Sequence, residues 1–186
     1  MLTNGATADL QASLLDSVLR KLFDCGCTAV SITFDGLSAN QKTLKKLGGH
    51  LDGDNMLSSF SHPCDLSVKA AVLVDACHML KLTRNLLSEY QIPIVDGVAQ
   101  AKWHHIENLH ELQQNEGLTL ANRLTERHVQ YKSQKMKLKQ AAQLLSASCV
   151  SALEFHRNYH YEGFEDSLGT EIFIEHIDRL RKVSFG

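Results

Sequence analysis

The chain contains the segment Ala29-Val30-Ser31-Ile32-Thr33-Phe34-Asp35-Gly36-Leu37-Ser38-Ala39-Asn40, in which an apolar, β-branched run ends abruptly at an acidic turn. A helix-start pattern, Ser-Ala-Asn, follows at once. In open α/β sheets this arrangement holds a carboxylate at the carboxyl end of a strand, where ligand and metal sites are built. The segment therefore predicts a strand over residues 28–34, mostly buried on both faces, and a helix over residues 38–47.

A second strand that ends in an acid lies around Val74-Asp75-Ala76. We predict a short buried strand over residues 70–74, a helix over 76–90, and a loop over 50–67 that leads into them. Upstream, apolar residues recur at helical spacing over residues 8–23, and Cys25-Gly26 is suited to end that helix. The order helix, strand, helix marks the start of a parallel α/β layer.

Beyond Pro93 the pattern becomes mostly helical. Only a weak strand candidate remains, over residues 92–95. Helices are predicted over 103–113, 137–155 and 170–182. Trp103 is expected to anchor the core, with His104 and His105 mostly exposed. The predicted division is an α/β part over residues 1–91 followed by a helical part over 92–186.

Composition excludes several classes of protein. A net charge of −2 gives no global electrostatic attraction for nucleic acid, and we favour a solvated helix face for the two local lysine clusters. The five cysteines include no Cys-x2-Cys pair, so we expect structural thiols rather than a zinc site. No signal peptide or membrane-spanning run is visible, and a reduced compartment is expected.

Asp35 and Asp75 are the candidate site residues, and each has two interpretations. Asp35 could bind a divalent cation, because hard cations prefer oxygen ligands, or it could cap the following helix or form a turn. Asp75 could be an auxiliary metal-facing carboxylate, although we favour a helix N-cap. Arg84, on the helix after Asp75, could contact phosphate or be solvated.

Several motifs together resemble the P-element-like DNA transposases, including the THAP-domain transposases of animals. The motifs occur in order along nearly the whole chain, at residues 34–40, 75–85, 103–106, 124–128, 135–146 and 169–174. The resemblance implies a partial RNase H-like core followed by the start of a mostly helical insertion domain. It further implies DNA cleavage and strand transfer with Mg²⁺ or Mn²⁺ bound by a triad of acids.

By this resemblance Asp35 matches the second acid of the triad. The first acid and the final Glu have no counterpart here, and neither has the zinc-binding THAP module. We therefore expect a central fragment that is inactive alone. The resemblance further implies GTP binding by the complete insertion domain, DNA transposon ends as partner, self-association and a nuclear location. No membrane association is expected. GTP-contacting residues cannot be assigned from the motifs. The alternative hypothesis is a domesticated, non-catalytic interaction or regulatory protein.

Overall fold

The computed structural model describes residues 7–36, 38–90, 92–95, 99–117 and 124–185. The chain forms two compact units, Met1–Asp75 and Ala76–Gly186, which we call the N-terminal and C-terminal units. We expected the division after residue 91. The helix that follows Asp75 packs instead on helices of the C-terminal unit.

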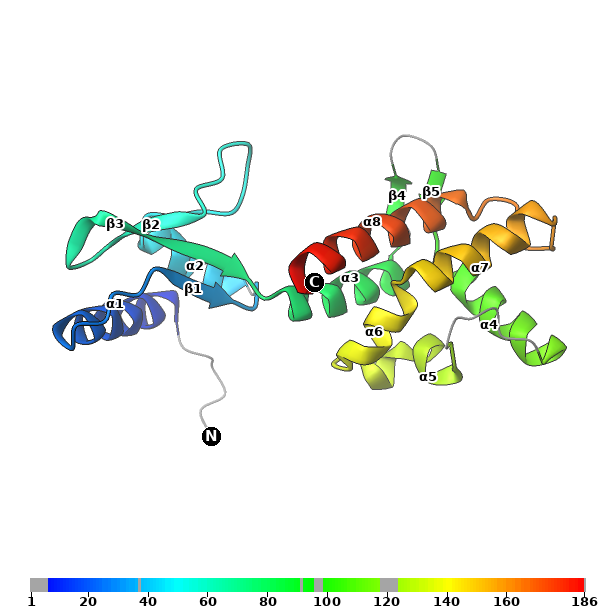
Figure 1. Cartoon of the computed structure of the whole chain (residues 1–186), viewed down its shortest axis with the longest axis horizontal. Coiled ribbons are helices and arrows are strands. Elements are labelled where there is room, and N and C mark those ends of the chain that lie inside the picture. Colours follow the sequence, from blue (N-terminus) through cyan, green and yellow to red (C-terminus); the bar gives the residue numbers. More distant parts are fainter. Residues whose placement is uncertain (1–6, 37, 91, 96–98, 118–123, 186) are drawn as a thin grey trace. The chain divides into compact units, whose positions relative to one another are not determined.

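The N-terminal unit contains two helices and a three-stranded sheet (Figure 1). Its elements are α1 (Ala8–Asp24), β1 (Ser31–Phe34), α2 (Ser38–Lys46), β2 (Ser59–His62) and β3 (Asp65–Val74). The strand order is β1-β3-β2, with β1 parallel and β2 antiparallel to β3. The first two helices agree with the prediction, and Cys25 caps the end of α1, followed by Gly26 in the left-handed conformation (φ 79°).

The predicted loop over residues 50–67 is wrong in part, because it contains β2 and the beginning of β3. The prediction that the first strand is buried on both faces is also wrong, since Ser31 and Thr33 are exposed. Along β3 the buried Ala70 and Val72 alternate with exposed neighbours. Both helices contribute to the core on that buried face, whose fully buried members are Leu19, Leu44, Phe60, Ala70 and Val72. The described part of the sheet is therefore covered on one face only.

The C-terminal unit is mostly helical. Its elements are α3 (Ala76–Glu89), β4 (Ile92–Val95), β5 (Ala99–Ala101), α4 (His104–Glu116), α5 (Glu126–Val129), the 3₁₀ helix η1 (Tyr131–Gln134), α6 (Leu138–Leu144), α7 (Ala147–Asn158) and α8 (Leu168–Phe185). Strands β4 and β5 form an antiparallel hairpin. In Figure 1, α7 and α8 lie side by side, and α8 also contacts β5.

One long helix over residues 137–155 was predicted, but the structure contains two. Ser146 has an extended backbone (φ −135°, ψ 156°), which ends α6 and begins α7. Its hydroxyl donates a hydrogen bond to the Gln143 carbonyl at 2.7 Å. The unit has a large apolar core drawn from most of its helices, and Trp103 packs against it as predicted. Within the described ranges, no helix is both long enough and apolar enough to span a membrane.

Candidate functional site

Asp35 and Asp75 lie at the same edge of the N-terminal sheet. Phe34 and Val74, the residues before them, are partners in the parallel pairing of β1 with β3. The Asp75 amide donates a hydrogen bond to the Phe34 carbonyl at 2.8 Å. The pairing thus brings the two strand-end acids to adjacent positions, both half-buried.

A side chain from α2 orients the Asp35 carboxylate. Asn40 lies in the first turn of α2, and its Nδ2 donates a hydrogen bond to Asp35 Oδ1. Gly36 has a φ of 81°, which glycine adopts at low cost, and this allows the turn between β1 and α2. The sequence contained Asn40 within the helix-start pattern, but the pattern did not indicate a contact with Asp35.

Arg84 is not available to phosphate, so both predicted roles for it are wrong. It is completely buried, and its Nε donates to Asn85 Oδ1 at 2.8 Å. Its Nη2 donates to the carbonyls of Gln134 and Lys135, both at 3.1 Å. Tyr131 lies under the guanidinium carbon, 5.7 Å from the ring centroid. Arg84 therefore fastens the end of η1 to α3.

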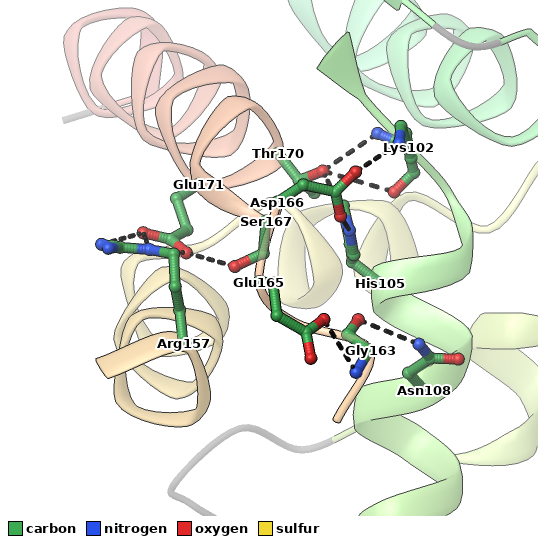
Figure 2. A network of polar contacts seen from close by, with 10 residues as sticks. All are labelled: Lys102, His105, Asn108, Arg157, Gly163, Glu165, Asp166, Ser167, Thr170 and Glu171. Carbon is green, nitrogen blue, oxygen red and sulfur yellow. Dashed lines mark hydrogen bonds and ion pairs between the residues drawn. The ribbon is translucent and has the colours of Figure 1, made fainter. Parts of the chain in front are cut away.

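A second set of polar contacts connects the start of α4 with the start of α8 in the C-terminal unit. Figure 2 shows His105 between Asp166 and Thr170, with Lys102 beside them. His105 Nε2 lies 2.8 Å from Asp166 Oδ1, and Nδ1 lies 2.7 Å from Thr170 Oγ1. The Lys102 amide donates to Thr170 Oγ1 at 2.9 Å, and the Lys102 ammonium pairs with Asp166. These contacts join residues more than sixty positions apart.

Burial and charge set the protonation states in this second set. His105 is completely buried, contrary to the prediction that it is exposed, and burial lowers the pKa of its imidazole. Hydrogen bonds from Lys102 and His105 lower the pKa of Asp166 to about 2. A neutral imidazole therefore lies against a carboxylate near neutral pH. No sequence motif indicated Asp166.

A neighbouring ion pair fastens α7 to α8 (Figure 2). Arg157 Nε and Nη2 donate to the two carboxylate oxygens of Glu171 at 2.9 and 3.0 Å. The Ser167 hydroxyl donates to Glu171 Oε1 at 2.6 Å. Because these contacts satisfy the buried Glu171 carboxylate, we assign this pair to the fold.

A pocket of about 730 Å³ opens on the C-terminal unit. Trp103 and Tyr131 lie in its wall with their rings edge to face, 5.5 Å between centroids. The full lining is Ser88, Glu89, Trp103, Glu107, Val129, Gln130, Tyr131, Lys132 and Ser133. Its size and its aromatic and charged lining suit a ligand as large as a nucleotide.

Models of two protein families match the chain. One, described as a TNP-like, GTP-binding insertion domain, matches residues 77–183. The other, described as a TNP-like, RNase H N-terminal domain, matches residues 1–48. These matches confirm the predicted fold class, a partial RNase H-like core followed by a mostly helical insertion region.

Two curated proteins and one solved structure are also similar. DNA transposase THAP9 of Homo sapiens is 35% identical over 178 residues, which are 95% of this chain and 19% of that protein. Transposable element P transposase of Drosophila melanogaster is 31% identical over 158 residues, 84% of this chain and 20% of that protein. The Drosophila P element transposase strand transfer complex matches with a TM-score of 0.74 and 28% identity, over 94% of this chain and 37% of that one. The chain thus spans about a fifth of the curated relatives.

Proposed function

The chain belongs to the TNP-like family of P-element and THAP-type DNA transposases, and we propose that it contributes part of the cation-binding catalytic edge of such an enzyme. The observation that supports this most directly is the pairing of Phe34 with Val74, which brings Asp35 and Asp75 to one sheet edge. The chain spans about a fifth of the length of its curated relatives. We therefore propose for the whole protein, and not for this chain alone, DNA cleavage, strand transfer, transposon ends as partner and a nuclear location. These 186 residues alone are expected not to cleave DNA.

The residues at this edge suit a hard divalent cation. Mg²⁺ and Mn²⁺ prefer oxygen ligands, and Asp35 would be the ligand, with Asp75 as an auxiliary carboxylate. When bound, the cation would polarise a phosphodiester and stabilise its leaving oxygen. Asn40 would orient the Asp35 carboxylate through the hydrogen bond from its amide. The helix-cap interpretation of Asp75 stays an alternative that the same experiment addresses.

Paramagnetic broadening by Mn²⁺ in NMR spectra of the ¹⁵N-labelled chain tests this proposal. We expect Mn²⁺ to broaden the amide signals around Asp35 and Asp75, and Asp35→Asn to remove that broadening. Asp54→Asn, at an exposed acid distant in sequence from this edge, is the matched control and should leave it unchanged. Broadening that survives Asp35→Asn would refute the metal role of Asp35. If Asp35→Asn removes the broadening and Asp75→Asn leaves it unchanged, the helix-cap interpretation of Asp75 is supported.

The role of Asn40 is tested separately from that of Asp35. Asn40→Ala should weaken Mn²⁺ binding by about tenfold or more, the usual cost of losing a group that orients a metal ligand. Gln41→Ala removes an exposed amide from the same helix and should leave the affinity unchanged. Equal affinities for Asn40→Ala and Gln41→Ala would refute the Asn40 role while leaving that of Asp35 intact.

We further propose that the C-terminal unit binds a guanine nucleotide, as the description of its family suggests. The pocket at Trp103 and Tyr131 is the candidate position, since aromatic rings can stack on a base and Lys132 can pair with phosphate. Calorimetric titration with GTP should give binding that Lys132→Glu weakens. GTP binding that ignores Lys132→Glu would exclude this pocket, and no heat at all would exclude nucleotide binding by these residues.

Self-association, and with it the alternative of a non-catalytic interaction protein, is supported by α1. Leu10, Leu14 and Val18 repeat every four residues and are each about half exposed (51%, 55% and 51%), so α1 presents an apolar stripe. We propose that a second copy of the chain covers this stripe. Sedimentation velocity should show a dimer that Leu14→Glu dissociates, whereas Arg20→Glu on the same helix is the charge control. A monomer at all concentrations would refute the proposal.

A further inference from the structure

His104, His105 and Asp166 offer one ligand atom each, and these three atoms all lie within 4.8 Å of one another. No other group of three such side chains converges in this way within the described ranges. We propose that these three residues bind a zinc ion or a similar transition-metal ion. This site belongs to the C-terminal unit and does not depend on the transposase chemistry proposed for the Asp35 edge.

The approach to the site is open on one side. His104 and His105 are the first residues of α4, and their rings lie 4.1 Å apart between centroids. His105 is completely buried, whereas His104 is exposed and the Asp166 side chain is 54% exposed. An ion can therefore reach the ligands from solvent and still be held against a fixed, buried imidazole.

Thr170 supports His105 in the way that metal-binding histidines require. Such a histidine usually donates its second ring N–H to a neighbouring oxygen, which sets the tautomer and the ring orientation. Thr170 Oγ1, 2.7 Å from His105 Nδ1, is that oxygen, and the Lys102 amide holds it in place. With Nδ1 protonated and donating to Thr170, the Nε2 lone pair is directed toward the Asp166 carboxylate and the ion.

The same positions also serve the metal-free protein. In the other tautomer Nε2–H donates to Asp166 Oδ1, and the Thr170 hydroxyl donates to Nδ1. A shift of one proton across the ring and a turn of one hydroxyl therefore separate the two states. The site is organised before any ion arrives, which lowers the cost of binding.

The donor set selects the class of metal. Two imidazole nitrogens and one carboxylate oxygen suit zinc, cobalt, nickel or copper, whereas magnesium and calcium prefer oxygen alone. Three protein ligands leave a fourth tetrahedral position for water.

Lys102 gives the proposal a distinctive consequence. Its ammonium group pairs with Asp166 and would lie next to the bound ion, where like charges repel. Removing it in Lys102→Met should therefore strengthen zinc binding. If the contacts serve only the fold, Lys102→Met would lower stability and leave zinc binding unchanged.

Zinc titration of the reduced chain by calorimetry, with Co²⁺ absorption spectra alongside, tests the site. We expect one tetrahedral ion, with at least tenfold weaker binding in His104→Ala and in Asp166→Asn. Lys102→Met should bind more tightly, and His110→Ala, a histidine of the same helix outside the group, should match wild type. The exposed His104 allows its variant to fold, and Trp103 fluorescence checks that it has.

Two results would overturn the proposal. One is a wild-type chain that takes up no zinc at stoichiometric concentration. The other is zinc binding that persists in both ligand variants with a cobalt–thiolate charge-transfer band. That band would assign the ion to the exposed Cys25, Cys27 or Cys64.

Discussion

Different kinds of contact stabilise the two units of this molecule. In the N-terminal unit the described sheet has helices on one face, and apolar side chains such as Leu73 (52% exposed) lie on the other. The C-terminal unit has a larger core, and buried polar side chains such as His105 and Glu171 connect separate helices. The difference suggests that the C-terminal unit is stable by itself, whereas the N-terminal unit depends more on surfaces that cover it.

The largest expected effects come from a matched pair of completely buried leucines, Leu44 in the N-terminal unit and Leu144 in the C-terminal unit. Leu→Ala in a core costs about 2–5 kcal/mol, and the cost is greater where the surroundings cannot collapse into the cavity. We expect Leu144→Ala toward the upper end of this range and Leu44→Ala toward the lower end. Urea denaturation followed by Trp103 fluorescence reports the C-terminal unit, and amide hydrogen exchange in β3 reports the N-terminal unit.

The same two leucine variants also test whether the two units differ in stability independently of each other. If the units unfold independently, Leu44→Ala should leave the Trp103 transition unchanged. A shift of that transition comparable with the one caused by Leu144→Ala would mean that the two units unfold together.

Buried and exposed polar contacts give the next largest difference. Arg84→Met removes the hydrogen bonds that the buried guanidinium donates to the Gln134 and Lys135 carbonyls, and because hydrogen bonds from a charged donor are worth about 1.5–3 kcal/mol each, we expect a loss of about 2–3 kcal/mol. Lys45→Met breaks an exposed ion pair with Asp52 in the N-terminal unit and should have little effect. The midpoints of urea denaturation measure both. Equal effects of the two substitutions would show that Arg84 has no special structural role.

Local sequence patterns predicted what depends on local spacing. The apolar residues of α1 and α3 and the helix-start pattern of α2 predicted the bounds of these helices closely, and the run before Asp35 predicted a strand that ends in an acid. In contrast, Ser59-Phe60-Ser61-His62 is a strand because β3 lies beside it, and its polar alternation resembles a loop. Pairing partners far along the chain are not encoded in the local pattern.

The candidate sites show the same limit. Asp35 and Asp75 could be identified from the sequence because each directly follows an apolar run. His105 was expected to be exposed, since its burial depends on Thr170 and Asp166, more than sixty residues later. Arg84 could not be distinguished from a solvated cation for a similar reason, because the carbonyls that it binds belong to η1.

A smaller effect separates two glycines with positive φ, Gly163 (83°) and Gly26 (79°). Alanine at either position meets the left-handed strain of an L-residue, about 1–2 kcal/mol. At Gly163 the added Cβ would also lie 2.6 Å from Asn108 Nδ2, which donates to the Gly163 carbonyl, whereas at Gly26 it meets open space. We expect Gly163→Ala to be the more destabilising of the two in thermal unfolding. If Asn108→Ala removes that excess cost, the contact with Asn108 is its cause.

The smallest expected effect is a loss of stability of the C-terminal unit at acidic pH, through His128. Burial lowers the pKa of His128, and the positive charge of Arg84 and a nearby His110 act in the same direction, while the hydrogen bond to Gln143 opposes them. Thr125 N–H donates to His128 Nδ1 at 3.0 Å, which requires the lone pair of the neutral ring. Because the folded pKa lies below the unfolded value of about 6.5, the unfolded chain binds more protons below that pH. The contribution of His128 is therefore complete above about pH 6.5 and decreases as the pH falls toward the folded pKa.

Urea midpoints from Trp103 fluorescence at pH 7.5 and 5.5 measure this dependence. His128→Gln removes the titrating group, so it should lower stability at pH 7.5 and flatten the difference between the two pH values. His160→Gln, at an exposed position in the same unit, should leave the difference unchanged. If His128→Gln has the same pH dependence as wild type, the acid sensitivity belongs to other groups of the C-terminal unit.

Hydrogen exchange in β3 over the same pH range extends the measurement to the N-terminal unit. His128 lies in the C-terminal unit, so the exchange free energies of β3, corrected for intrinsic rates, should not follow its titration unless the two units unfold together.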